Sequence, residues 1–203
     1  YTYYNMIKLK EYKLSIDTFI GGWFIPNKIC DDLIKIYKKN QNKIETGAVR
    51  NLTTGKVEVD ESIKSCQQLP IEHNNFDKEV GKYRFYLQEC LLKYVKKFPS
   101  VHTSNDRFNI ISDYNYQHYK PKQGFKEWHC ERMGKYNGKR VLVFMTYLND
   151  VDDGGTMFKN FNLITPAKKG LTLIWPTDWP WEHKGQISKT KEKHIITGWY
   201  EFI

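Results

Sequence analysis

The stretch that decides the fold is Arg140-Val141-Leu142-Val143-Phe144-Met145-Thr146-Tyr147-Leu148. It is rich in β-branched and aromatic residues and has turn-forming residues on both sides, which predicts a strand. Further strands are expected at residues 109–119, 171–175 and 193–202, with a turn at Asp152-Asp153-Gly154-Gly155. Short strands without helical periodicity between them are typical of a sandwich or barrel, and a cupin-type double-sheet jelly roll has a mouth that can hold a metal.

The first half of the chain is predicted to be helical. Apolar residues recur at helical spacing over residues 28–39, where Asn27 is the expected N-cap. A longer helix is predicted from Asn75 or Asp77 to about residue 97, since an apolar stripe covers this stretch and a proline follows it. The fold class expected for the whole chain is therefore mainly β with flanking N-terminal helices (α+β).

The length of 203 residues suits one well-buried domain spanning 1–203. Within it, residues 1–105 are expected to form a helical and loop support region, and residues 106–203 the β core that carries a metal site. The polar segment Glu45–Leu69 is expected to be a loop with one short strand that could border a substrate groove.

The charge and cysteine content of the chain indicate which classes of binding partner and which cellular compartment to expect. The net charge is +9, but only five of the 32 basic residues are arginine, and specific phosphate and base recognition favours arginine. A nucleic-acid partner is therefore not expected. No apolar run approaches the ~20 residues of a membrane helix, and no signal peptide pattern is visible. The four cysteines form no CxxC pair and are expected to be reduced thiols, which predicts a cytoplasmic protein.

The tripeptide His129-Cys130-Glu131 is a candidate for two metal ligands. Alternate residues of a strand share a face, so His129 and Glu131 point together if this stretch is extended. Two histidines and one carboxylate form the facial triad that holds Fe(II) with open positions for ligands. His183 would then be the third ligand, and we expect it on a later strand of the opposing wall.

The last predicted strand places Lys193, Thr197 and Trp199 on one face and His194 on the other. A lysine that points into a barrel needs a carboxylate partner, because burial of an unpaired charge is costly. No acidic residue is its obvious mate, so a diacid ligand would serve. The alternative is that Lys193 is solvated, like the lysines that precede it.

Taken together, the second half of the chain resembles the prolyl 4-hydroxylase branch of the 2-oxoglutarate/Fe(II)-dependent dioxygenases. The resemblance covers roughly residues 110–203 and rests on several motifs in the order and at the intervals of that family. These motifs are Tyr119, Gln123-Gly124-Phe125, His129-Cys130-Glu131, Arg140, Thr146-Tyr147-Leu148-Asn149-Asp150-Val151, Gly154-Gly155-Thr156-Met157-Phe158, Pro166, Gly170, His183-Lys184-Gly185, Lys193 and Gly198-Trp199.

The resemblance implies a double-stranded β-helix and assigns roles to particular residues. It implies that the iron ligands are His129, Glu131 and His183, and that Lys193 pairs with the distal carboxylate of the cosubstrate 2-oxoglutarate. Residues implied to contact the cosubstrate or to line the pocket near the iron are Tyr119, Tyr147, Thr197 and Trp199. The implied cofactor is Fe(II), and ascorbate is a further candidate.

Two departures from the family pattern concern Glu131 and Lys122. The family usually has aspartate at the carboxylate position, and Glu131 is one methylene longer but still an oxygen ligand. Lys122 stands where many relatives have glycine. We expect these changes to affect the substrate more than the metal.

The function that the resemblance implies is an oxidoreductase that uses O2 to hydroxylate an unactivated C–H bond. A prolyl residue in a peptide or protein is the first candidate substrate. The alternatives are a free amino acid or other small molecule, oxidative demethylation of nucleic acid, and, in a different class, a non-catalytic cupin-like binding module. A peptide substrate predicts an open groove and a small molecule a closed pocket, whereas the oligomeric state stays open.

Overall fold

The computed structural model describes residues 7–51, 53–75, 77–103 and 106–203. The helices are α1 (Asn27–Lys39), α2 (Lys78–Lys97) and the short α3 (Ser100–Thr103). One large sheet has the strand order β1 (Lys10–Glu11), β2 (Gly21–Phe24), β14 (Leu171–Pro176), β11 (Arg140–Tyr147), β16 (Lys193–Phe202), β9 (Tyr114–Tyr119), β7 (Gln67–Ile71) and β3 (Glu45–Thr46), with β8 (Phe108–Asn109) paired to β16.

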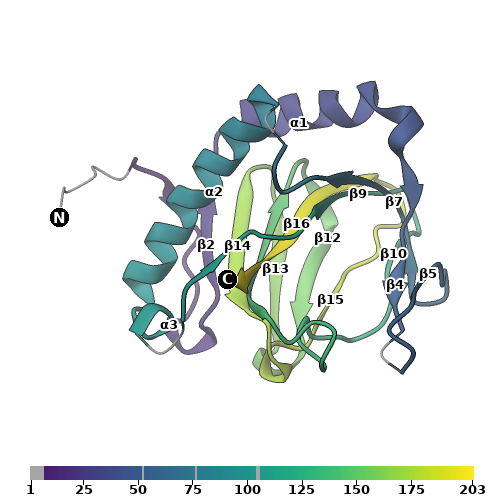
Figure 1. Cartoon of the computed structure of the whole chain (residues 1–203). Coiled ribbons are helices and arrows are strands. Elements are labelled where there is room, and N and C mark those ends of the chain that lie inside the picture. Colours follow the sequence, from purple (N-terminus) through teal and green to yellow (C-terminus); the bar gives the residue numbers. More distant parts are fainter. Residues whose placement is uncertain (1–6, 52, 76, 104–105) are drawn as a thin grey trace.

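A smaller sheet faces the large one. It consists of β13 (Leu163–Ala167), β12 (Val151–Phe158) and β15 (His183–Gly185). Two further strand pairs are β10 (Gly124–Phe125) with β6 (Lys64–Ser65), and β4 (Val49–Arg50) with β5 (Val57–Glu58). Figure 1 shows β4, β5 and β10 together at the end of the molecule away from α3. The antiparallel two-layer architecture confirms the predicted jelly roll with flanking N-terminal helices.

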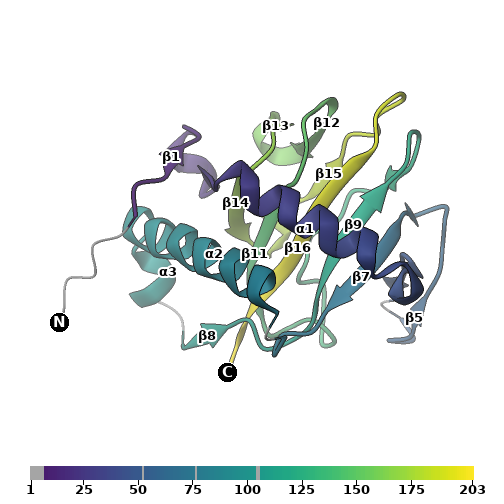
Figure 2. The ribbon, with the colours of Figure 1, turned by 90° about the horizontal axis from the view of Figure 1, so that it is seen from above.

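The helices cover the outer face of the large sheet. Figure 2 shows α1 and α2 side by side across its strands. Strand alternation divides the core into two clusters, because successive side chains leave opposite faces. In β11, Leu142 and Phe144 pack against the helices, whereas Val143, Met145 and Tyr147 lie between the two sheets. The large sheet therefore has one face for the helices and one for a cavity.

The two long helices match the apolar stripes of the sequence. Asp77 is the N-cap of α2, where its carboxylate accepts hydrogen bonds from the amides of Glu79 and Val80, as predicted. The prediction for α1 was wrong by one residue, because Asn27 is the first helical residue and Pro26 occupies the N-cap position. No helix in these described ranges is long and apolar enough to cross a membrane. All four cysteines are buried free thiols.

The predicted turn at residues 152–155 is wrong, because these residues belong to strand β12. The strand is irregular there, and its register against β13 shifts between Val151 and Thr156. The two glycines serve close approach rather than a reversal of the chain. A Cβ at Gly155 would collide with the carbonyl oxygen of Thr165, and one at Gly154 would lie 2.6 Å from the side chain of Val151.

This close approach predicts that Gly155→Ala destabilises the protein by about 1–3 kcal/mol, because the added methyl group must displace backbone of β13. Thermal or urea unfolding measures the change. Gly81→Ala is the matched control, since a Cβ at this position in α2 meets nothing within 4 Å. That control is expected to be neutral or stabilising by roughly 0.5–1 kcal/mol. Equal stabilities of the two variants would contradict the account of β12.

The segment at residues 45–69 also differs from its prediction. One short strand was expected, but β3, β4, β5, β6 and the start of β7 all lie within it. Each of the first four is only two residues long, and β6 pairs with β10, about 60 positions further along the chain. Strands this short form only because they pair with distant segments, and they are too short to show an alternating hydrophobic pattern in the sequence.

Candidate active site

A cavity of ≈ 740 Å³ opens between the large sheet and the small sheet. The eight site residues predicted from the sequence all line it: Tyr119, His129, Glu131, Tyr147, His183, Lys193, Thr197 and Trp199. Strands β9, β11 and β16 of the large sheet contribute one wall, and β12 and β15 of the small sheet contribute to the other. The structure therefore brings the whole predicted set into one place.

Three of these side chains form a group that could hold a metal ion. Glu131 Oε1 lies 3.6 Å from His129 Nε2 and 3.6 Å from His183 Nε2. The ligand atoms of the three residues all lie within 4.8 Å of one another. Ligands at about 2.1 Å from a metal and at right angles to each other are roughly 3 Å apart. Only small shifts are needed for all three to reach one ion.

The remaining ring nitrogens are held by the backbone. His129 Nδ1 lies 3.1 Å from the carbonyl oxygen of Glu127, and His183 Nδ1 lies 2.9 Å from that of Trp181. A carbonyl only accepts, so each Nδ1 carries the proton and each Nε2 presents its lone pair to the metal position. Burial, with His129 beside it, also lowers the pKa of His183, which keeps this ring neutral.

The arrangement of the histidines corrects one prediction. His183 was expected on the wall opposite His129, but the two residues are backbone neighbours. The amide of His129 donates to the carbonyl of His183 at 3.1 Å, and the amide of His183 donates to that of His129 at 2.8 Å. Phe125 stacks on the His129 ring with 3.8 Å between centroids, which restricts its rotation.

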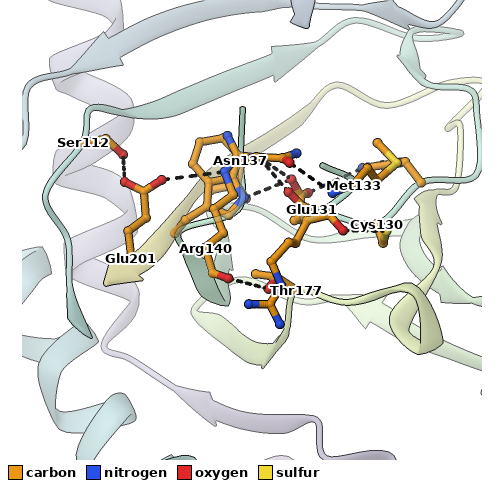
Figure 3. Close-up of polar contacts among 12 residues, drawn as sticks. Ser112, Cys130, Glu131, Met133, Asn137, Arg140, Thr177 and Glu201 are labelled. Atoms are coloured by element: carbon orange, nitrogen blue, oxygen red, sulfur yellow. Dashed lines mark hydrogen bonds and ion pairs between the residues drawn. The ribbon is translucent and has the colours of Figure 1, made fainter. Parts of the chain in front are cut away.

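Glu131 is fixed through its other oxygen, Oε2. Arg140 Nη1 donates to it at 3.2 Å, and Trp199 Nε1 donates to it at 2.9 Å. The Arg140 guanidinium lies 3.4 Å from the centroid of the Trp199 ring. Figure 3 shows the chain of polar contacts that continues from Arg140 through Glu201 to Ser112. These contacts leave Oε1 free to face the histidines.

The charge of Glu131 is maintained despite its burial. Burial alone would raise the pKa of this carboxyl, but the neighbouring imidazoles of His129 and His183 hold the pKa well below its usual range. Glu131 is therefore an ionised carboxylate in a closed setting, which is the form that binds a metal ion.

Lys193 is buried, lines the cavity and lies over the ring of Tyr119. Its ammonium donates to the carbonyl oxygens of Gly154 at 3.1 Å and Gln186 at 2.8 Å. Among the described residues, no carboxylate lies within salt-bridge distance of Lys193. Burial lowers the pKa of Lys193 to about 8. A buried ammonium with one donor to spare suits a carboxylate ligand.

The tyrosines and Thr197 complete this part of the cavity. The Tyr119 hydroxyl donates to Gln117 Oε1 at 2.6 Å, and the Tyr147 hydroxyl lies 2.6 Å from Thr156 Oγ1. Thr197 Oγ1 donates to the carbonyl of Phe144 at 3.2 Å. Each side chain is therefore held in one orientation at the wall.

Two charged residues of the cavity received no role from the sequence. Arg140 was part of the family motif, but its contact with Glu131 cannot be read from a strand pattern. Lys64 was hidden in the segment taken for a loop. It is a buried lysine on the cavity wall, and its ammonium donates to the carbonyl of Ala48 at 3.3 Å and to Gln68 Oε1 at 3.1 Å.

The cavity of this jelly roll contains two histidines, a carboxylate and a buried lysine. This set of side chains is typical of a metal-dependent oxygenase. Residues 114–201 match the 2OG-Fe(II) oxygenase superfamily. This part of the chain therefore matches an oxygenase superfamily that uses Fe(II) and 2-oxoglutarate, and the fold around it is prolyl 4-hydroxylase-like.

Solved structures share this fold at low sequence identity. A prolyl-4-hydroxylase from Pseudomonas putida is 15% identical with a TM-score of 0.67, over 93% of this chain and 97% of that chain. A viral collagen prolyl hydroxylase from Paramecium Bursaria Chlorella virus-1, in its 2OG complex, is 19% identical with a TM-score of 0.65, over 91% and 97%.

A third solved structure contains a peptide. The prolyl hydroxylase from Trichoplax adhaerens, in complex with a peptide fragment of the hypoxia inducible factor oxygen degradation domain, is 16% identical with a TM-score of 0.66, over 91% of this chain and 84% of that chain. No curated protein sequence matches the chain. The fold is therefore shared, whereas the substrate has to be argued from this cavity.

Proposed function

We propose that the protein hydroxylates a C–H bond of a prolyl residue in a peptide or protein, with His129, Glu131 and His183 as the ligands of Fe(II). Lys193 pairs with the distal carboxylate of 2-oxoglutarate, while Tyr119, Tyr147, Thr197 and Trp199 border the cosubstrate. The proposal rests on one observation: a single cavity contains three convergent metal ligands and a buried lysine that has no carboxylate partner in the described part of the chain.

When bound, Fe(II) with 2-oxoglutarate supplies an oxidative decarboxylation, in which O2 and 2-oxoglutarate give succinate, CO2 and one oxygen atom for the substrate. The residues of the chain orient the reactants for this chemistry. Arg140 and Trp199 hold the carboxylate of Glu131, and the backbone carbonyls hold both imidazoles in one tautomer. Lys193 supplies a positive charge at a fixed position, which selects a diacid of the right length and orients it in the cavity.

The mouth of the cavity supports a peptide substrate. The segment at residues 45–69 forms one rim through β4 and β5, where the exposed side chain of Val57 lines the opening. Met133 lines it as well and is also exposed. Exposed apolar side chains at an opening suit an extended polypeptide better than a small polar metabolite. The complex of the Trichoplax adhaerens enzyme with a peptide is a related arrangement.

One observation favours a second candidate, a small substrate that carries a carboxylate. Lys64 is opposite Phe125 in the pairing of β6 with β10, and Phe125 stacks on His129. Its ammonium therefore lies on the wall beside the proposed iron position. Both of its hydrogen-bond acceptors are uncharged, and burial lowers its pKa. A substrate carboxylate, from a free acid or an acidic side chain, would neutralise this cation.

Lys64→Met separates these two candidates. Removal of a buried, unneutralised charge is expected to raise the free energy of unfolding by about 1–2 kcal/mol, while substrate-dependent succinate formation falls. Unfolding by urea and KM for the substrate measure the two effects. The control is Lys56→Met, an exposed lysine of the same segment, which should change neither. Reduced stability with unchanged KM would show that Lys64 has only a structural role.

The proposed activity is tested by incubating the protein with Fe(II), 2-oxoglutarate, ascorbate and O2 against proline-containing peptides, free amino acids and single-stranded nucleic acid. Substrate-dependent succinate and a mass gain of one oxygen atom on a prolyl residue are expected. Gain of oxygen only on a free acid would favour the second candidate. No succinate with any substrate, in protein that binds iron, would contradict hydroxylation and favour a cupin-like binding module.

We also propose that residues 1–203 act as one domain, in which residues 1–105 support the β core at residues 106–203. Support comes from β2, β7 and β3, which pair into the same large sheet as the strands of the core. A cytoplasmic location is in line with four free thiols. Activity of the chain in a reducing lysate, and loss of folding on truncation of the first half, are the expected results.

A further inference from the structure

A second group of metal-ligating side chains lies outside the catalytic cavity. His118, on β9, and His194, on β16, face the helices rather than the cavity, and Glu192 precedes β16. Glu192 Oε2 is 3.1 Å from His118 Nε2 and 3.6 Å from His194 Nε2. The three ligand atoms lie within 4.8 Å of one another, as do those of the catalytic triad.

The outer nitrogen of each ring is held by a tyrosine. Tyr116 Oη lies 2.9 Å from His194 Nδ1, and Tyr37 Oη lies 3.1 Å from His118 Nδ1. The Tyr37 hydroxyl donates its proton to Gln67 Oε1 at 3.2 Å, so it accepts from His118 Nδ1. His118 Nε2 then directs a lone pair at the Glu192 carboxylate. A ring nitrogen and a carboxylate that face each other at 3.1 Å are stabilised by a cation between them, either a proton or a metal ion.

The backbone around this group is fixed before any ligand binds. Asn149 Nδ2 donates to the carbonyl of Glu192 at 2.8 Å, and the amide of His194 donates to Asn149 Oδ1 at 2.8 Å. His118 and His194 are direct partners in the pairing of β9 with β16. The sheet therefore fixes the positions of the two histidines, and metal sites on rigid secondary structure are held more precisely than sites on loops.

The group lies in an open hollow of ≈ 440 Å³ that is lined in part by the C-terminal half of α1. The two imidazoles are buried and stacked, with 4.3 Å between centroids and 8° between planes, while Glu192 is exposed. The ligand atoms of the two rings and Glu192 already lie within 4.8 Å of one another, and binding of one ion requires the stacked rings to tilt toward each other. The exposed Lys38 also borders the hollow, and its long side chain is free to turn toward water.

We propose that His118, Glu192 and His194 form a second metal site, which binds a divalent transition ion such as Zn²⁺ with water as the fourth ligand. Two imidazoles and one carboxylate are a known ligand set for zinc, whereas Mg²⁺ and Ca²⁺ prefer oxygen ligands. Tyr37 and Tyr116 orient the imidazoles through their Nδ1 atoms, as hydrogen-bond partners of metal-bound histidines do.

The second metal site and the proposed cosubstrate pocket lie on opposite faces of the same two strands, β9 and β16. Lys193 separates Glu192 from His194 in the sequence, and its register partner Tyr119 follows His118. Because strand side chains alternate, the same residues of β9 and β16 serve the metal on one face and the cavity on the other. A bound ion would brace the end of β16 from which Lys193 reaches 2-oxoglutarate.

The test is the zinc content of the protein after dialysis against Zn²⁺, measured by elemental analysis. The catalytic triad also binds zinc, so the triad is removed in His129→Ala/His183→Ala. We expect wild type to hold one ion at each of two sites, the triad variant to hold one, and Glu192→Gln to hold one. The triad variant that also carries Glu192→Gln should hold none.

Three further measurements make the result specific. Tyr116→Phe keeps the ring but loses the hydroxyl, and should weaken zinc binding in the triad variant roughly 10- to 100-fold. His73→Ala removes an exposed histidine whose ring pairs with the carboxylate of Asp113, and should leave the zinc content of the wild type unchanged. Circular dichroism confirms folding, for which the exposed Glu192 is a mild change.

Three outcomes would overturn the proposal. The first is a triad variant that is folded but binds no zinc. The second is Glu192→Gln with the zinc content of the wild type, and the third is a combined variant that retains one ion. Any of them would leave His118, Glu192 and His194 as a hydrogen-bonded brace of β9 and β16.

Discussion

His183→Ala is expected to abolish iron binding and turnover together. His183 Nε2 and His129 Nε2 both face Glu131 Oε1, and with one ring removed a single imidazole and one carboxylate remain. Metal chemistry supplies several kcal/mol to catalysis, so succinate formation should fall by roughly a thousandfold or more. Iron bound per chain after anaerobic dialysis and succinate formation measure the two losses.

The control is His73→Ala, because His73 is exposed and lies outside the cavity. It should retain the iron and the activity of the wild type. Equal iron content and turnover in His183→Ala and His73→Ala would contradict the assignment of the facial triad.

Lys193→Ala should leave iron binding intact and weaken the binding of 2-oxoglutarate. Loss of one partner of a buried, hydrogen-bonded charge pair costs about 2–5 kcal/mol, which is roughly 30-fold to several-thousand-fold in Kd. The affinity is measured by anaerobic titration of the iron-loaded protein with 2-oxoglutarate. Lys191→Ala is the matched control, since Lys191 is two residues away but exposed and paired with Asp152.

Lys193→Arg is a more demanding variant. It retains the charge, but the guanidinium must fit a space where the Lys193 ammonium is held by two carbonyls. We expect an affinity between those of the wild type and Lys193→Ala. Unchanged affinity in Lys193→Ala would contradict the proposed contact with the distal carboxylate.

Lys193 also predicts a dependence on pH. Its pKa in the free protein is lowered to about 8 by burial. Below this pH the ammonium is charged, and we expect it to bind the diacid directly. Above it, the protein must take up a proton to bind, so the Kd for 2-oxoglutarate should rise about tenfold per pH unit. A Kd that stays constant from pH 7 to pH 10 in the wild type would contradict this.

The sequence predicts those features that depend on strand alternation. Lys193, Thr197 and Trp199 line the cavity and His194 lies on the other face, because side chains on a regular strand have no other arrangement. The capped start of α2 at Asp77 was predictable for the same local reason. In each case the information lies within a few neighbouring residues.

Features that depend on tertiary contacts were missed or predicted wrongly. Gly154-Gly155 resembles a turn, but Gly155 is required by the approach of Thr165 from another strand and Gly154 by the side chain of Val151. Neither the direct pairing of His129 with His183 nor the burial of Lys64 leaves any periodic signal. The contact of Arg140 with Glu131 depends on the packing of Trp199, which is contributed by a third segment.

The departure at Glu131 has a physical account in these contacts. A glutamate is longer and has one more rotatable bond than the aspartate usual in the family, so it loses more side-chain entropy when it is fixed. Arg140 and Trp199 both bind its Oε2 and thereby select one rotamer. The two contacts let the longer carboxylate present Oε1 at the distance that the histidines need.

The most direct test of the central claim is an anaerobic titration of the wild-type protein with Fe(II) and 2-oxoglutarate, monitored by visible absorption. Chelation of the iron by the keto acid gives a charge-transfer band only when the protein holds both. The account predicts a band that saturates at one iron and one 2-oxoglutarate per chain. A folded protein that gives no band and leaves the iron unbound would contradict it.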